Sequence, residues 1–426
     1  MSQPPFDIPA LVAATYEESA ARPFADRDTL GLMRGFPPAP ATRVDRRNFM
    51  GAPRNRWAFQ HISRLLPSID VPASTRVREL PRAERDLGGL AFASIGGRSV
   101  TLSQHLAASH TDGFVVLKDG AIAFEHYANG QTPATRHIMF SVTKSLIGVL
   151  AERLVVEGRL DDRLRADAIL PELHGSAFGD ATVRQLMDMA VGIHYREDYE
   201  DPLSESSQFG WASGLVAPRA AQMATLPPEY EGLDNLYAYL PRLRKRGEHG
   251  GFFDYVTAVT EVVAWVIERH TGEACHQMLA RLWDGIGAER DAYFIADPSG
   301  RNVCGAGFNA TLRDMARFGQ MLLDFGRVGE RQVLPRTVVE SLLAGSDPAI
   351  FAANPEFAPI GPFSYRSQWY VLNGHALLAI GVHGQQLHVD FDARVVCVKQ
   401  SSQPAAVSAI NADTGALMQA LGRALR

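Results

Sequence analysis

Phe140-Ser-Val-Thr-Lys-Ser-Leu-Ile-Gly-Val149 is the stretch of this 426-residue chain on which the fold and the chemistry depend. Ser141 and Lys144 lie three residues apart, where a polar segment gives way to an apolar periodic run over 146–155. That run predicts a helix that begins at or near Ser141. Positions i and i+3 share one face of a helix, so the serine hydroxyl and the lysine amine can meet.

The start of a helix also suits a serine nucleophile. Backbone N–H groups and the positive end of the helix dipole lie beside Ser141, and a nucleophile needs a base in reach and a place for developing negative charge. A Ser-x-x-Lys quartet also arises by chance, with the serine only a helix cap. Lysine is rare here, however: only four of the 42 Lys and Arg residues are lysine. Lys144 falls on the apolar side of its helix, where a dry site favours the neutral amine.

Composition excludes several classes of protein. The net charge is −5 and no basic stripe with interleaved aromatics occurs, so nucleic acid is not an expected partner. No apolar run approaches the about 18 residues of a membrane span, and no signal peptide is visible. The cysteines at 275, 304 and 397 and the scattered histidines lack metal-ligand spacing. We therefore expect reduced thiols in a cytoplasmic protein that holds no metal.

Strand-like segments occur towards both ends of the chain, with helices between them. Two apolar runs over 114–127 flank a turn at Asp119-Gly120 and predict a hairpin. Four more strand-like runs lie between 368 and 399. We expect a mixed α/β fold of the α+β kind, in which an antiparallel sheet formed by both termini is flanked by helices and an inserted domain is mainly helical. The predicted parts are an extended N-terminal arm (1–85), the sheet domain (86–160 with 300–426) and the helical domain (161–299).

Five motifs together are far more specific than any one of them. They are Phe140-Ser-Val-Thr-Lys-Ser145, Glu197-Asp-Tyr199, Tyr255-Val-Thr257, Thr311-Leu-Arg-Asp-Met-Ala-Arg-Phe-Gly319 and Gly381-Val-His-Gly-Gln385. With this layout, the chain resembles the serine β-lactamase-like superfamily of class C β-lactamases, penicillin-binding proteins and family VIII carboxylesterases. The likeness is greatest to the 6-aminohexanoate-dimer hydrolases, and it extends from residue 55 to residue 402.

The resemblance implies a set of catalytic residues. It makes Ser141 the nucleophile and Lys144 and Tyr255 the groups that move its proton. The N–H groups of Ser141 and Val382 would form the oxyanion hole. An adjacent ammonium can lower the pKa of a tyrosine, so the sequence leaves open whether Lys144 or Tyr255 is the acylation base. No cofactor is implied.

One family motif is absent. β-Lactamases carry Lys-Thr-Gly on the strand beside the nucleophile, whereas this chain reads Ala379-Ile-Gly-Val382. The lysine of that motif holds the carboxylate of a β-lactam. Its loss predicts that unstrained amides and esters are substrates and that β-lactams are poor ones.

Three further residues are weaker candidates for substrate contacts. Tyr199 matches a substrate-facing tyrosine of the nylon-hydrolase pattern, although an amphipathic surface tyrosine explains it too. His383 either lines the pocket or bonds backbone, and Trp211 either forms a wall of the acyl pocket or only packs. Gly305-Ala-Gly307 lacks the strand-to-helix context of a nucleotide-binding loop.

The sequence therefore predicts a serine hydrolase that cleaves a small-molecule amide or ester through an acyl-enzyme. Two alternatives remain open. One is a carboxylesterase with little amidase activity, and the other is a sensor that is acylated and never turns over. Substrate, stereochemistry and a possible homodimer are not determined by the sequence.

Overall fold

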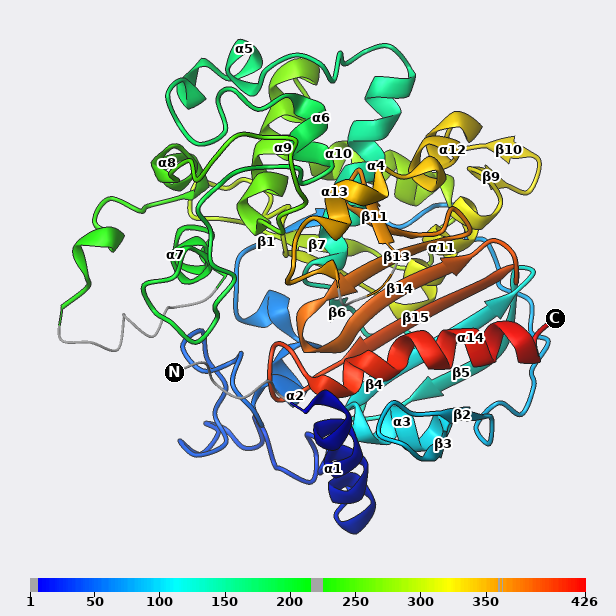
Figure 1. Cartoon of the computed structure of the whole chain (residues 1–426). Coiled ribbons are helices and arrows are strands. Elements are labelled where there is room, and N and C mark those ends of the chain that lie inside the picture. The colour runs from blue at the N-terminus through cyan, green and yellow to red at the C-terminus, as the bar shows by residue number, and fades with distance from the viewer. Residues whose placement is uncertain (1–6, 216–224, 359–360, 362) are drawn as a thin grey trace.

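A seven-stranded antiparallel sheet joins the two halves of the chain in the computed structural model, which describes residues 7–215, 225–358, 361 and 363–426 (Figure 1). In spatial order its strands are β11 (Phe363–Arg366), β12 (Trp369–Leu372), β13 (Ala376–Gly381), β14 (Gln385–Asp390), β15 (Val395–Ser401), β4 (Thr111–Lys118) and β5 (Ala121–Tyr127). β15 pairs with β4 from Val395 opposite Lys118 to Gln400 opposite Gly113. The predicted α+β fold, with its sheet drawn from both ends of the chain, is confirmed.

Alternation along the strands sends side chains into two cores. Val115 and Leu117 of β4 join the core that contains α4 (Val142–Val156) and α11 (Leu312–Leu323). Phe114 and Val116 point to the other face. That face is covered by α1 (Ile8–Ala21), α3 (Leu102–Ala108) and α14 (Thr414–Ala424) (Figure 1). The sheet is therefore buried on both faces, which holds the strand ends near Ser141 in place.

The remaining helices and strands complete the body. A four-stranded sheet runs in the order β1, β7, β8, β6, and two short ribbons pair β2 with β3 and β9 with β10. The strands are β1 (Ser68–Val71), β2 (Ala91–Ala93), β3 (Ser99–Thr101), β6 (His137–Ile138), β7 (Ala292–Ile295), β8 (Phe308–Ala310), β9 (Arg327–Val328) and β10 (Arg331–Gln332). The helices are α2 (Asn55–Ala58), α5 (Ala166–Ile169), α6 (Val183–Met187), α7 (Glu205–Ala212), α8 (Leu236–Tyr239), α9 (Thr257–Thr271), α10 (Cys275–Gly285), α12 (Arg336–Ala344) and α13 (Pro348–Ala352). No helix in the described part of the chain is long and apolar enough to cross a membrane.

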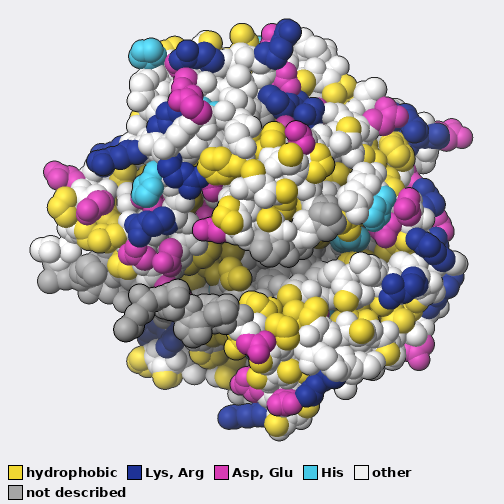
Figure 2. Space-filling view, viewed as in Figure 1, with side chains coloured by type: hydrophobic (Ala, Val, Ile, Leu, Met, Phe, Trp, Pro, Cys, Tyr) yellow, Lys and Arg dark blue, Asp and Glu magenta, His cyan; other side chains and the backbone are white. Residues whose placement is uncertain are grey.

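The helix that carries the central motif is the junction of these parts. α4 contacts α9, α10 and α12 as well as strands β12, β13 and β14. It begins directly after Ser141, as predicted. Figure 2 shows that the face of the molecule seen in Figure 1 is hollowed near its centre, with hydrophobic side chains gathered around the hollow.

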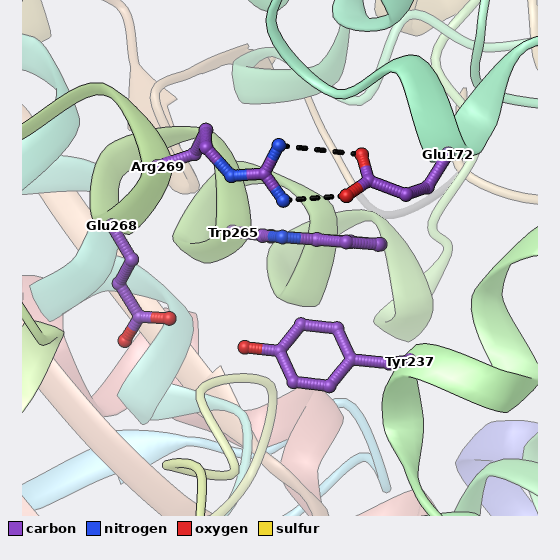
Figure 3. Close-up of a pocket in the computed structure, with 5 residues that line it drawn as sticks. All are labelled: Glu172, Tyr237, Trp265, Glu268 and Arg269. Atoms are coloured by element: carbon purple, nitrogen blue, oxygen red, sulfur yellow. Dashed lines mark hydrogen bonds and ion pairs between the residues drawn. The ribbon is translucent and has the colours of Figure 1, made fainter. Parts of the chain in front are cut away.

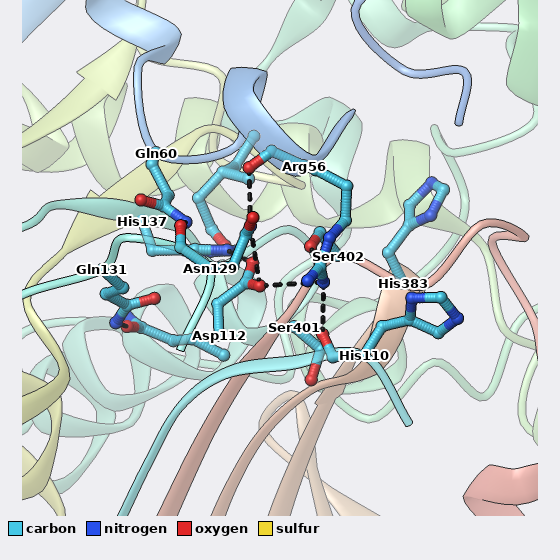
Figure 4. Close-up of polar contacts among 12 residues, drawn as sticks. Arg56, Gln60, His110, Asp112, Asn129, Gln131, His137, His383, Ser401 and Ser402 are labelled. Atoms are coloured by element: carbon cyan, nitrogen blue, oxygen red, sulfur yellow. Dashed lines mark hydrogen bonds and ion pairs between the residues drawn. The ribbon is translucent and has the colours of Figure 1, made fainter. Parts of the chain in front are cut away.

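The N-terminal segment is tied to the sheet by buried polar side chains (Figure 4). Asn55 donates to the carbonyl oxygens of Ser402 and Gln403, at 3.2 and 2.8 Å. The guanidinium of Arg56 lies 3.1 Å from the carboxylate of Asp112, and both side chains are almost fully buried. The segment expected as an extended arm also contains the 14-residue helix α1. The three predicted domain limits remain a prediction.

Gly148 tests how closely α4 packs against the sheet domain. A Cβ added there would lie 1.8 Å from the carbonyl oxygen of Ser367. We expect Gly148→Ala to lower the free energy of unfolding by about 3 kcal/mol or more, because the added methyl group forces the backbone of α4 away from the backbone at Ser367. Gly415→Ala in α14 is the control, since nothing lies within 4 Å of its added Cβ. Chemical denaturation of both variants measures the difference, and equal stabilities would contradict this packing.

Candidate active site

A strand, a sharp turn and a helix place Ser141. β6 pairs with β8, the N–H of Met139 donates to the Phe308 carbonyl at 2.8 Å, and α4 follows at once. Phe140 takes a φ of 43°, in the left-handed region that costs a non-glycine residue of order 1 kcal/mol. Its ring is held by an edge contact to Phe59, with centroids 5.0 Å apart. The turn is thus fixed by packing, and Ser141 is only 8% exposed.

Lys144 lies one turn along α4 and points back at the serine. Its Nζ is 2.8 Å from Ser141 Oγ and donates to the Gly305 carbonyl at 2.6 Å. The side chain is 1% exposed. Burial lowers the pKa of Lys144 to about 8, against the opposing charges of Glu197 and Glu261. An amine with this pKa is neutral often enough near neutral pH to accept a proton.

Tyr255 stands just before α9 and completes the cluster. Lys144 Nζ lies 5.2 Å from the centre of its ring. Burial raises the pKa of Tyr255 well above its usual range, Tyr370 and Glu197 add to the shift, and a hydrogen bond with Ser141 opposes it. The phenol therefore keeps its proton, whereas the amine of Lys144 loses its own more readily. This ordering favours the lysine as the base and the tyrosine as a proton donor.

The end of β13 runs directly against the nucleophile turn. A Cβ added to Gly381 would lie 2.6 Å from the Met139 carbonyl and 3.2 Å from the Ser141 nitrogen. Only glycine allows this approach, which brings the following residue, Val382, beside the serine. Within the described residues, no acceptor pairs with the N–H of Ser141. That free donor is what an oxyanion hole requires.

The lysine that β-lactamases carry on this strand is replaced by apolar residues. β13 ends in Ala379, Ile380 and Gly381, and Ile380 is 36% exposed. Lys399 of β15 is the lysine nearest in sequence to β13. It is buried, and it donates to Ser401 Oγ at 2.7 Å and to the Gly384 carbonyl at 3.3 Å. Lys399 therefore supports the turn after Val382 rather than facing a substrate.

The three weaker candidates occupy different surroundings. Tyr199 is 40% exposed, and its hydroxyl donates to Glu197 Oε2 at 2.7 Å. His383 is buried, its Nδ1 lies 2.7 Å from the Gln403 carbonyl, and burial lowers its pKa to about 4. It is thus a neutral histidine bonded to backbone. The ring of Trp211 packs edge-on against Tyr230 at 6.0 Å.

Sequence reasoning missed three groups that organise the site. Glu197 Oε1 accepts from the N–H of Thr257 at 2.9 Å and so holds the start of α9 beside Tyr199. Glu261 is fully buried in α9 and accepts from the N–H of Gly305 at 2.7 Å. Gly305 was considered only for nucleotide binding, yet its carbonyl is a partner of Lys144. The one signal for Glu261 is its position as the single charge within the apolar run of α9.

A separate hollow lies beside α9 (Figure 3). Its volume is about 530 Å³, and it is lined by Glu172, Tyr237, Trp265, Glu268 and Arg269. An ion pair between Arg269 and Glu172, at 2.6 Å, lies across it. It contains no nucleophile with a base in reach. The chemistry therefore selects the cluster around Ser141 as the candidate active site.

The fold and this cluster define a serine hydrolase of the β-lactamase type, and a family model described as Beta-lactamase matches residues 101–418. The chain belongs to that family, and the expected relation to it is confirmed. It is 35% identical over 381 residues to the 6-aminohexanoate-dimer hydrolase of Paenarthrobacter ureafaciens, covering 87% of this chain and 91% of that protein.

Solved structures give the same picture. A Bacillus anthracis structure assigned as a 6-aminohexanoate-dimer hydrolase superposes with a TM-score of 0.81 at 30% identity, over 90% of this chain and 97% of that one. A family VIII carboxylesterase shares the fold, with a TM-score of 0.50 at 14% identity, over 71% and 92% of the two chains. The protein is accordingly a hydrolase of the β-lactamase family.

The pKa of Lys144 predicts how the reactivity of Ser141 changes with pH. The fraction of neutral amine rises tenfold per pH unit below a pKa of about 8. We expect the rate constant for labelling Ser141 with a fluorophosphonate to rise about tenfold per unit below pH 7 and to level off above about pH 9. Intact-protein mass spectrometry follows the label, with decay of the reagent in buffer as the control. A rate that is flat from pH 6 to 9 would exclude Lys144 as the titrating base.

Proposed function

We propose that this protein hydrolyses linear amide and ester bonds of small molecules through an acyl-enzyme on Ser141. The observation that carries the proposal is the 2.8 Å contact between Ser141 Oγ and the buried amine of Lys144. The likeness to the 6-aminohexanoate-dimer hydrolase of Paenarthrobacter ureafaciens, at 35% identity, supports a linear amide as the substrate class, as does the likeness to a Bacillus anthracis protein assigned to the same activity, at 30%.

The residues of the cluster share the proton transfers and the stabilisation of charge in this mechanism. Neutral Lys144 takes the proton of Ser141 as Oγ attacks the carbonyl carbon. The N–H groups of Ser141 and Val382 donate to the oxyanion that forms. Tyr255 gives its proton to the leaving amine or alkoxide and regains one from the Lys144 ammonium. Water then attacks the acyl group as Lys144 takes its proton, and the Lys144 ammonium returns that proton to Ser141 Oγ when the bond between Oγ and the acyl carbon breaks.

The surroundings of Ser141 determine which acyl groups suit the site. β13 offers an apolar edge at Ala379 and Ile380 instead of a cation. A charge-assisted contact to a substrate carboxylate is worth about 1.5–3 kcal/mol, or about 10- to 100-fold in affinity. Penicillins and cephalosporins lose that contact here, whereas linear amides and esters do not depend on it.

Two other activities use the same groups. A carboxylesterase with little amidase activity needs the same nucleophile and oxyanion hole, and the fold likeness to a family VIII carboxylesterase is compatible with it. A sensor would stop at the acyl-enzyme. We place the protein in the cytoplasm, which its three free, buried cysteines support.

Substitution of the nucleophile tests the proposed function directly. We expect Ser141→Ala to reduce hydrolysis of p-nitrophenyl acetate and of a linear 6-aminohexanoate dimer by at least about 10³-fold, because the members of such a cluster act as a unit. A phosphonate label should map to Ser141. Wild-type protein that releases one product per active site and then stops would be a sensor. Activity surviving in the alanine variant would refute the assignment of Ser141, whereas nitrocefin turnover equal to that of the esters would refute the predicted substrate class.

Tyr199 separates amide from ester cleavage. A leaving amide nitrogen needs a hydrogen-bond partner, while a phenolate leaves with less help. We therefore expect Tyr199→Phe to reduce kcat/KM for amides about tenfold and for matched p-nitrophenyl esters less than about threefold. Tyr237→Phe, which alters a partly exposed tyrosine of the separate hollow, is the control and should change neither. Equal losses on both substrates would place Tyr199 outside the amide-cleavage step.

A further inference from the structure

Gly305 joins the base to a second buried charge. Its carbonyl accepts from Lys144 Nζ at 2.6 Å, and its N–H donates to Glu261 Oε1 at 2.7 Å. The lysine and the glutamate therefore hold the same residue from its two sides. Neither partner is exposed: Lys144 is 1% and Glu261 0% accessible. Because both side chains are buried, these two hydrogen bonds fix the direction from which the amine approaches Ser141.

Close packing leaves Gly305 little freedom to move. A Cβ added to it would lie 3.1 Å from Thr257 Cγ2 and 3.2 Å from Glu261 Oε1. The backbone at this point rests directly on the first turns of α9. Any displacement of the Glu261 side chain would thus be passed to the carbonyl that orients Lys144.

The charge of Glu261 is only partly compensated by its neighbours. Arg301 Nη2 lies 3.9 Å from Glu261 Oε2, too far for a hydrogen bond, and Arg301 also faces Glu268 at 3.8 Å. Within the described residues, Glu261 Oε2 has no hydrogen-bond partner. Burial raises the pKa of Glu261 to about 7, Arg301 and the N–H groups of Gly305 and Cys304 oppose the rise, and Asp297 adds to it. The side chain is therefore mostly ionised in the pH range in which Lys144 titrates, near 8. The carboxylate therefore acts on Lys144 through a medium that screens it weakly.

We propose that Glu261 is a positioning residue of the hydrolase, one that orients Lys144 through Gly305 and sets the pH at which that amine becomes a base. The inference rests on the proposed role of Ser141 and Lys144. Glu261 itself does not touch Ser141 and is not a catalytic residue.

The direction of the effect follows from the two charges. Burial lowers the pKa of Lys144, and the ionised carboxylates of Glu197 and Glu261 oppose this by favouring the ammonium form. Removal of the negative charge lowers that pKa, and activity then persists to lower pH. Loss of the hydrogen bond to Gly305 has a different result, because the amine is misdirected and kcat falls at every pH. Charge and orientation can thus be separated by the choice of variant.

Three variants and one control test the proposal, with p-nitrophenyl acetate as substrate from pH 5.5 to 10. Glu261→Gln keeps an acceptor for the Gly305 N–H and removes the charge, so the acid limb of kcat/KM should move down by about half to one pH unit. Glu261→Ala removes both, so kcat should also fall at least about tenfold with KM within about twofold. Gly305→Ala displaces the carbonyl and keeps the charge, so kcat should fall while the acid limb stays. Glu268→Gln alters the other carboxylate beside Arg301 and should leave the profile unchanged.

The readouts distinguish failure of this inference from failure of the proposed function. Phosphonate labelling that maps to Ser141 in every variant keeps the proposed function intact. If Glu261→Gln then retains the wild-type acid limb, or if Glu268→Gln shifts it equally, Glu261 is only structural and the proposal is overturned. Thermal melts identify a Glu261 variant that does not fold. In that case the pH profile of Gly305→Ala is the test, and an unchanged kcat in that variant would overturn the proposal.

Discussion

The burial of one amine governs this site. Lys144 is 1% exposed and its pKa is lowered by burial to about 8, from an ordinary value near 10.4. That difference corresponds to about 3 kcal/mol of preference against the ammonium. The structure offsets part of this cost through Ser141 Oγ, the Gly305 carbonyl and the face of the Tyr255 ring. Removal from water suits the lysine to its proposed role as a base, and the hydroxyl of Ser141 lies within hydrogen-bond reach of its amine.

The partners of Lys144 come from segments that are far apart in the chain, so the fold is needed to assemble them. The turn before α4 supplies Ser141, the first turn of α4 supplies the lysine, the residues just before α9 supply Tyr255, and the segment before β8 supplies Gly305. The end of β13 closes the site at Gly381, where glycine alone lets the strand approach the serine nitrogen. Because the sheet is formed from both ends of the chain, β13 can reach a helix more than 200 residues away in sequence. The active site and the sheet therefore both depend on the pairing of strands from the two ends of the chain.

Local patterns predicted the parts of the structure that local forces determine. The helix after Ser141 follows from apolar periodicity and the β4–β5 hairpin from its turn residues, and the structure contains both. Helix α1 was missed although Asp7 caps it and a proline lies in its first turn, because the surrounding composition is rich in Pro and Arg. The role of Gly305 had no local signal, since a carbonyl that binds a distant lysine leaves no trace in its own residue type.

Electrostatics around Ser141 also explains why a β-lactamase fold need not accept β-lactams. The charged groups that act on Lys144 are two carboxylates, Glu197 and Glu261. The lysine that β-lactamases carry on this strand is absent from β13. Lys399 is held at the turn after Val382 by hydrogen bonds to Ser401 and Gly384. A β-lactam carboxylate would therefore lack the charge-assisted contact on β13, which is worth about 1.5–3 kcal/mol. A linear amide or ester does not depend on that contact for its position at Ser141. The two carboxylates act on the base instead, where they oppose the effect of burial on the pKa of Lys144.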